Sequence, residues 1–266
     1  MSNPRSTEVG RPIPWTGLVF TLLGSLVLLF IIAPLAGILL SSSLGEITDA
    51  AADEEVRSSV SLTLSAALMA TIACTVTGIP LAYLLARKRF FGRTTLFAII
   101  DLPIIVPHTT AGIALLTVVG RDSLFGSTFG SLVGTAPGIA VAMAFVSVPF
   151  LINAAHNGFA KVPVHLESAA RTLGASPCRT FFTISVPLAW RDILTGMIMM
   201  WARGISEFGA VVIIAYHPMT TPTLVFERFN DYGLAHARSA AVVLLIICVL
   251  IFAALRFVAR RRSREE

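Results

Sequence analysis

Residues 60–86 read VSLTLSAALMATIACTVTGIPLAYLLA, and no side chain in this stretch carries a charge. A helix of about 20 apolar residues crosses the roughly 30 Å hydrocarbon core of a bilayer, so the stretch is long enough to span a membrane. Similar runs lie at residues 12–45, 102–120, 123–160, 193–226 and 239–255. Only Arg203 and Glu207 interrupt them. The pattern predicts an all-α integral membrane protein with six transmembrane helices.

The composition of the chain supports this prediction. Hydrophobic residues make up 55% of the sequence and charged residues 13%, whereas an ordinary soluble domain has about 25% charged residues. The runs lack the alternation of apolar and polar residues that transmembrane strands show. We expect a transmembrane domain at 15–259, with a cytoplasmic tail at 1–14 and a basic tail at 260–266. Its helices are expected at about residues 15–40, 60–86, 95–120, 132–156, 190–215 and 238–257.

The distribution of charge predicts the orientation of these helices. Most of the 20 lysines and arginines lie before the first helix, after the second, after the fourth or at the end of the chain. The loop after the first helix is instead acidic, with Glu46, Asp49, Asp53, Glu54 and Glu55. Since basic loops stay in the cytoplasm, both termini are expected there. The basic residues are thereby explained as topology anchors beside lipid, and no nucleic-acid partner is expected.

The loop between the fourth and fifth helices, residues 161–187, is long and amphipathic. A loop of this length in a compact protein is usually functional. Pro163 suits the first turn of a helix, Glu167 suits its positive end, and Arg171 follows four residues later. Gly174 is typical of a helix C-terminus. The pattern predicts a short helix on the cytoplasmic side, and the residues alone leave open that it merely lies on lipid.

This loop resembles the EAA loop of ABC importer permeases. In that pattern Glu-Ala-Ala is followed after three residues by Gly, and after nine more by Ile-x-Leu-Pro. The residues that fall on it are Ala169, Ala170, Gly174, Ile184 and Pro187. Ser168 takes the place of the Glu, with Glu167 one residue earlier, and Val186 replaces the Leu.

The resemblance implies a type I ABC importer permease in a prokaryotic cell membrane, with a cytoplasmic coupling helix that docks on a separate ATPase. The residues it implies for this coupling are Pro163, Glu167, Ser168, Ala169, Ala170, Arg171, Leu173 and Gly174. It also implies a homodimer, two ATPase subunits and an extracytoplasmic oxyanion-binding protein. The chain has no phosphate-binding Gly-x-x-x-x-Gly-Lys-Ser/Thr loop. We therefore expect no catalytic residue and no cofactor here, with ATP and Mg on the ATPase.

Two further segments are similar to molybdate/tungstate permeases, most closely the archaeal tungstate type. They are residues 101–116, DLPIIVPHTTAGIALL, and residues 201–218, WARGISEFGAVVIIAYHP. The similarity covers about residues 58–255. Sulfate permeases share the Glu-Phe-Gly segment at 207–209, so sulfate is the alternative substrate. The family implies that selectivity resides mainly in the external binding protein.

The candidates for the translocation pathway are His108, Thr109, Arg203, Ser206 and Glu207. Pro103 and Pro107 are expected to break the third helix, which places His108 to Thr110 at a helix N-terminus that suits an anion or serves as an ordinary cap. Arg203 and Glu207 lie four residues apart on one helix face. Charges inside a membrane usually face a bundle interior or a water-filled cavity. The pair either lines the pathway or only locks helix packing.

Other classes of protein have less support. The five histidines show no metal-ligand spacing, so we expect no metal site, and no second acid stands at a recognisable interval from Glu207. A channel without an ATPase or an intramembrane hydrolase therefore remains the weaker alternative. Residues 48–57 and Asp122 are expected outside, where they contact the binding protein or only water.

Overall fold

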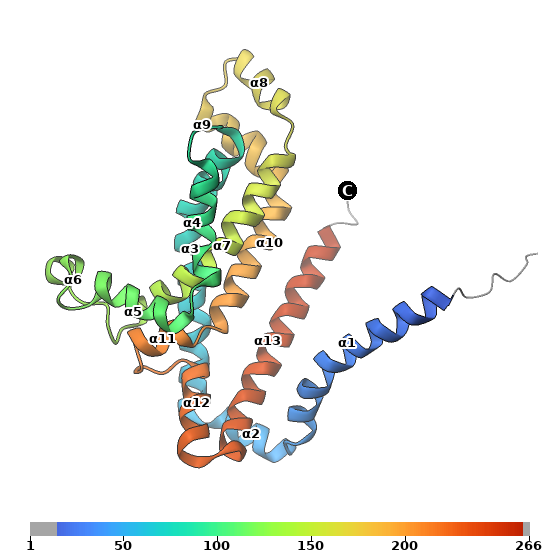
Figure 1. The fold of residues 1–266 in the computed structure, drawn as a ribbon, viewed down its shortest axis with the longest axis vertical. Coiled ribbons are helices and arrows are strands. Elements are labelled where there is room, and N and C mark those ends of the chain that lie inside the picture. Colours follow the sequence, from blue (N-terminus) through green and yellow to red (C-terminus); the bar gives the residue numbers. More distant parts are fainter. Residues whose placement is uncertain (1–14, 263–266) are drawn as a thin grey trace, which may run out of the picture.

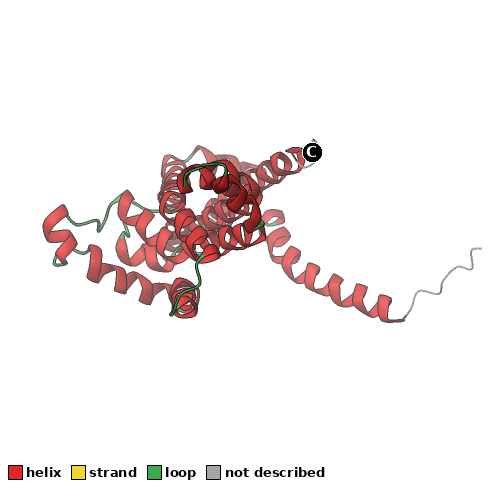
Figure 2. Ribbon diagram, turned by 90° about the horizontal axis from the view of Figure 1, so that it is seen from above, coloured by secondary structure: helices red, strands yellow, loops and turns green. Residues whose placement is uncertain are grey.

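The computed structural model describes the backbone of residues 15–262 and the side chains of residues 15–253. Every regular element in this described part is a helix (Figure 2). In chain order they are α1 (Trp15–Leu40), α2 (Leu44–Ala52), α3 (Glu54–Arg87), α4 (Arg93–Ile105), α5 (His108–Val119), α6 (Leu124–Phe129), α7 (Ala136–Lys161), α8 (Val164–Thr172), α9 (Pro177–Thr180), η1 (Phe181–Ser185), α10 (Val186–Ile205), α11 (Gly209–Ile214), α12 (Thr221–Tyr232) and α13 (Leu234–Arg262). η1 is one turn of π-helix.

The centre of the fold is formed by α3, α7 and α10, which pack along their lengths (Figure 1). Small residues let these helices approach closely, as is common between membrane helices. At Gly196 of α10, an added Cβ would lie 2.9 Å from Ala154 Cβ of α7. At Gly204, it would lie 3.3 Å from Ala67 Cβ of α3. The three helices therefore form a dense bundle, and α4 packs against α7 beside it.

Four of the described helices are long and apolar enough to cross a bilayer: α1, α3, α7 and α13. The pair α4 and α5 makes a fifth if it counts as one span, and the two helices are bent by 114°. The break that Pro107 predicts is present, and α5 begins at His108. A helix at 190–215 is wrong as a single element: α10 ends at Ile205 and α11 begins at Gly209. The count of six spans stays a prediction.

The two ends of the long axis carry different elements. The segment α8–α9 lies at one end, and α2 and α12 lie at the other (Figure 1). At the α2 end, the Arg228 guanidinium lies 2.7 Å from a carboxylate oxygen of both Asp53 and Glu55, and Arg238 lies 3.4 Å from Glu46. The hydrogen bond from Arg228 to Asp53 and the charge of Arg228 hold the pKa of Asp53 below its ordinary value. The acidic segment and the predicted coupling segment thus lie at opposite ends of the molecule.

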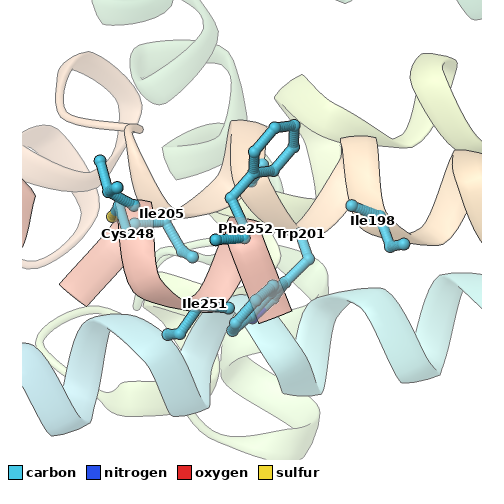
Figure 3. A pocket seen from close by; sticks show the side chains of 9 residues that line it. Ile198, Trp201, Ile205, Cys248, Ile251 and Phe252 are labelled. Atoms are coloured by element: carbon cyan, nitrogen blue, oxygen red, sulfur yellow. The ribbon is translucent and has the colours of Figure 1, made fainter. Parts of the chain in front are cut away.

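An apolar pocket lies between α10 and α13 (Figure 3). Trp201 and Ile205 line it from α10, and Cys248 and Phe252 line it from α13. None of its lining residues is charged. The pocket therefore offers a small oxyanion neither a positive charge nor a set of polar partners. The charged candidates lie elsewhere, around the breaks in the helices.

Candidate functional site

The short helix predicted in the loop 161–187 is α8, and its two ends have the chemistry that the sequence indicates. Pro163 precedes the first turn as the N-cap residue. At the other end Gly174 has a φ of +86°, a left-handed conformation that favours glycine. The Gly174 N–H donates to the Arg171 carbonyl at 2.9 Å, and the Ala175 N–H donates to the Ala170 carbonyl at 3.0 Å. These two bonds form a Schellman motif, which ends the helix.

Within α8 only Glu167 is buried, with 5% of its surface exposed. The remaining predicted coupling residues surround it on the outside: Pro163, Ser168, Ala169, Arg171, Leu173 and Gly174 are exposed, and Ala170 is partly buried. Leu173 is 89% exposed, although it is apolar. The helix therefore presents almost all of its surface outward and keeps one carboxylate inside.

The Glu167 carboxylate is held by groups from two other elements. The Arg87 Nε and Nη2 atoms of α3 donate to its Oε1 at 3.0 and 2.8 Å. The Tyr83 hydroxyl, also on α3, donates to Oε2 at 3.1 Å. The Ser185 hydroxyl at the end of η1 donates to Oε1 at 2.7 Å. Glu167 thus pairs with Arg87, eighty positions earlier, and these contacts come from tertiary packing rather than from Arg171 on its own helix.

Arg87 extends the network to a third helix. Its Nη1 donates to the Phe159 carbonyl at 2.8 Å, and its Nη2 donates to the Val162 carbonyl at 3.1 Å, both at the end of α7. Burial by itself raises the pKa of Glu167, but the hydrogen bonds from Arg87 and Ser185 and the charge of Arg87 outweigh it. The pKa of Glu167 therefore lies below its ordinary value. The carboxylate is ionised at neutral pH and forms a buried ion pair.

A second charged cluster lies where α10 and α5 meet. Arg203 Nη2 is 3.0 Å from Glu207 Oε2, so the predicted pair exists. His108 joins it from the first residue of α5: its Nδ1 lies 2.9 Å from Glu207 Oε2, and its Nε2 lies 2.9 Å from Arg203 Nη2. Ser206 Oγ accepts from Arg203 Nη1 at 3.3 Å. Thr109 is exposed beside this cluster.

The carboxylate of the cluster is buried, and its two basic side chains are partly exposed. The Glu207 side chain is 1% exposed, whereas Arg203 is 23% and His108 is 35% exposed. Glu207 Oε1 also accepts the Ala210 N–H at 2.9 Å, which ties it to the first turn of α11. The arrangement buries the negative charge of Glu207 and leaves the Arg203 side chain partly exposed.

Two glycines allow α5 and α11 to approach each other around this cluster. At Gly209 an added Cβ would lie 2.7 Å from His108 Cβ, and at Gly112 it would lie 2.8 Å from Ile213 Cβ. Both distances are shorter than carbon atoms tolerate. The break between α10 and α11 and the break between α4 and α5 are therefore packed directly against each other. The sequence analysis selected all four members of the cluster, which are His108, Arg203, Ser206 and Glu207. It had no signal for the close packing of α11 against α5.

Comparison with known proteins assigns the chain to a class. Residues 78–264 match the family described as binding-protein-dependent transport system inner membrane component, and the chain belongs to this family of ABC transporter permease subunits. A solved structure of a bacterial alginate ABC transporter, in complex with a periplasmic protein bound to an alginate pentasaccharide, has a TM-score of 0.72. The match has 13% sequence identity and covers 97% of this chain and 99% of that chain. It shows the type I permease fold.

Relatives of known name resemble the chain over most of its length. It is 42% identical to the molybdate/tungstate transport system permease protein of Pyrococcus abyssi, over 91% of this chain and 95% of the relative. It is 34% identical to a probable sulfate transport system permease protein of Chlorokybus atmophyticus, over 78% of this chain and 76% of the relative. Both relatives are named as permeases of oxyanion transport systems.

Proposed function

We propose that the chain is the membrane-spanning subunit of an ABC importer that carries tungstate or molybdate into a prokaryotic cell. The observation that carries the proposal is the 42% identity, over nearly the whole of both chains, to the Pyrococcus abyssi permease. Sulfate is the second candidate because the relative from Chlorokybus atmophyticus is named for sulfate, at the lower identity of 34%. Molybdate, tungstate and sulfate are tetrahedral dianions, so one pathway chemistry serves all three.

The chain is proposed to work with partners that supply energy and substrate. The exposed face of α8 docks on a separate ATPase, which binds ATP and Mg and performs the hydrolysis. Two copies of the chain form a homodimer around the pathway, with two ATPase subunits on the cytoplasmic side. An oxyanion-binding protein delivers the substrate at the opposite end, near α2 and α12. Support comes from family membership and from the separation of α8 and α2 along the molecule (Figure 1).

The pathway is proposed to pass the Arg203 cluster. The Arg203 side chain is partly exposed, and its guanidinium lies beside Ser206 and the His108 ring, next to the exposed Thr109. A guanidinium attracts a dianion and presents several N–H donors to its oxygen atoms. Glu207 offsets the positive charge, so the anion is attracted without being trapped. A charge in a membrane normally faces a protein interior or a cavity rather than lipid, and this cluster offers an anion both charge and donors.

Uptake by a reconstituted transporter tests the proposal. The chain is purified with its ATPase and its binding protein and placed in vesicles that contain ATP. We expect vanadate-sensitive accumulation of tungstate and molybdate when the binding protein is present. Uptake of sulfate alone would favour the second candidate, and uptake that needs neither ATP nor a binding protein would overturn the proposal. Titration of the binding protein with the three anions ranks the substrates.

A further inference from the structure

The helix that is proposed to dock on the ATPase is connected to the membrane bundle in an unusual way. A surface helix normally buries a stripe of apolar side chains against the rest of its protein. The apolar residues Val164 and Leu166 of α8 and Leu173 at its C-cap are exposed, and Glu167 is the residue of α8 that is buried. The side-chain attachment of α8 to the bundle is therefore a carboxylate and not an apolar face.

The groups that hold this carboxylate belong to elements that reach into the membrane. Arg87 and Tyr83 are in the last turns of α3, and Ser185 immediately precedes α10. The partner guanidinium is itself fixed by two carbonyls at the end of α7. A single side chain of α8 thus contacts α3 and η1 directly, and contacts α7 through Arg87.

The surroundings make this attachment stiff. The Arg87 and Glu167 side chains are 11% and 6% exposed. Charge-assisted hydrogen bonds of this kind are short and directional, and they are stronger than bonds between neutral groups. The rings of Tyr83, Phe159 and Phe181 lie against one another beside the pair, with centroids 4.9 to 6.0 Å apart. Displacement of α8 would have to break these contacts or carry the ends of α3 and α10 with it.

We propose that Glu167 and Arg87 form a latch that makes α8 move as one body with α3 and α10, so that closure of the ATPase is transmitted into the membrane. The inference rests on the proposed function, in which α8 docks on the ATPase. Glu167 is then a positioning residue that faces away from the ATPase, and the docking contacts are made by the exposed residues around it. Breaking the latch leaves docking intact and disconnects it from transport.

The test compares ATP hydrolysis with transport in the reconstituted complex of permease, ATPase and binding protein, with tungstate as the probe. The variants are Glu167→Gln, Arg87→Gln and the exchange Arg87→Glu with Glu167→Arg. The matched control is Asp192→Asn, which breaks an ion pair with Lys161 near the same end of the molecule, where the two side chains are 34% and 68% exposed. Co-purification of the ATPase reports docking, and tungstate transported per ATP hydrolysed reports coupling.

We expect both single latch variants to retain the ATPase and to transport about tenfold less tungstate per ATP, a change within the usual range of couplings between distant sites. The exchange variant should recover part of the loss, and Asp192→Asn should match the wild type. A wild-type ratio of transport to hydrolysis in the single variants overturns the latch. So does loss of the ATPase together with an unchanged ratio in whatever complex remains.

Milder variants keep the test decisive if a charge variant fails to fold. Ser185→Ala and Tyr83→Phe each remove one hydrogen bond to Glu167 and leave the ion pair in place. Each should lower the transport-to-hydrolysis ratio by about threefold, the effect of a modest hydrogen bond. An unchanged ratio in both overturns the latch. If the wild-type complex moves no oxyanion at all, the proposed function fails instead, which distinguishes the two failures.

Discussion

Removal of the Arg203 charge tests whether the intramembrane cluster has a role beyond packing. In Arg203→Gln the Glu207 carboxylate, 1% exposed, loses the partner at 3.0 Å and keeps His108 at 2.9 Å. Breaking a buried pair by removing one partner costs about 3–5 kcal/mol. Because the Arg203 side chain is itself 23% exposed, we expect a cost near the lower end, about 3 kcal/mol. For a chain of this size that lowers the melting temperature by about 6–12 °C.

The double variant Arg203→Gln with Glu207→Gln separates stability from transport. Both charges are then absent, so its melting temperature in detergent should return close to that of the wild type. If the cluster attracts the anion, the double variant still binds the ATPase and hydrolyses ATP but transports tungstate far more slowly. The matched control is Asp192→Asn, which breaks a partly exposed pair with Lys161 near the α8 end of the molecule and should change neither measurement.

The result that refutes the pathway role is plain. A double variant that folds and transports tungstate at the wild-type rate shows that the two charges serve packing alone. A single variant with an unchanged melting temperature contradicts the structural part of the argument, because a buried carboxylate that loses its guanidinium partner has to cost stability.

Three further predictions follow from the ends and the attachment of α8. Gly174→Val places a branched side chain at a φ of +86°, which costs about 1–2 kcal/mol for a non-glycine residue, and should abolish transport while the protein still inserts; normal transport with the ATPase bound contradicts the coupling role. A cysteine introduced at Ser176, in a background without the native cysteines, should react only with cytoplasmic reagent and one at Asp53 only with external reagent, and the reverse pattern inverts the topology. The pKa of Glu167 is lower in the folded than in the unfolded protein, so its contribution to stability is present above the unfolded pKa and is lost as the pH falls through the folded pKa. Melting temperatures measured in acid should therefore fall more steeply for the wild type than for the double variant Arg87→Gln with Glu167→Gln. Parallel curves would contradict this.

The sequence predicted the features that depend on neighbouring residues. Long uncharged runs indicated membrane helices because each backbone polar group in lipid needs a partner within its own helix. Pro107 indicated a break before His108, because proline restricts its own backbone conformation. Gly174 indicated the end of α8, because glycine adopts backbone conformations that other residues rarely adopt. The four-residue spacing of Arg203 and Glu207 predicted a contact that the structure contains, although α10 ends before Glu207, which lies in the break after this helix.

Only the tertiary structure decided which distant groups meet. Glu167 had a plausible partner in Arg171, but α8 turns that carboxylate toward Arg87 on α3. His108 contacts Arg203 and Glu207 because two broken helices pack closely at Gly209 and Gly112. The break before α11 contains no proline, so the sequence did not predict it. Hydropathy and turn chemistry are local properties of the chain. The partner of a buried charge is selected by the packing of whole helices, since that packing determines which groups lose water together.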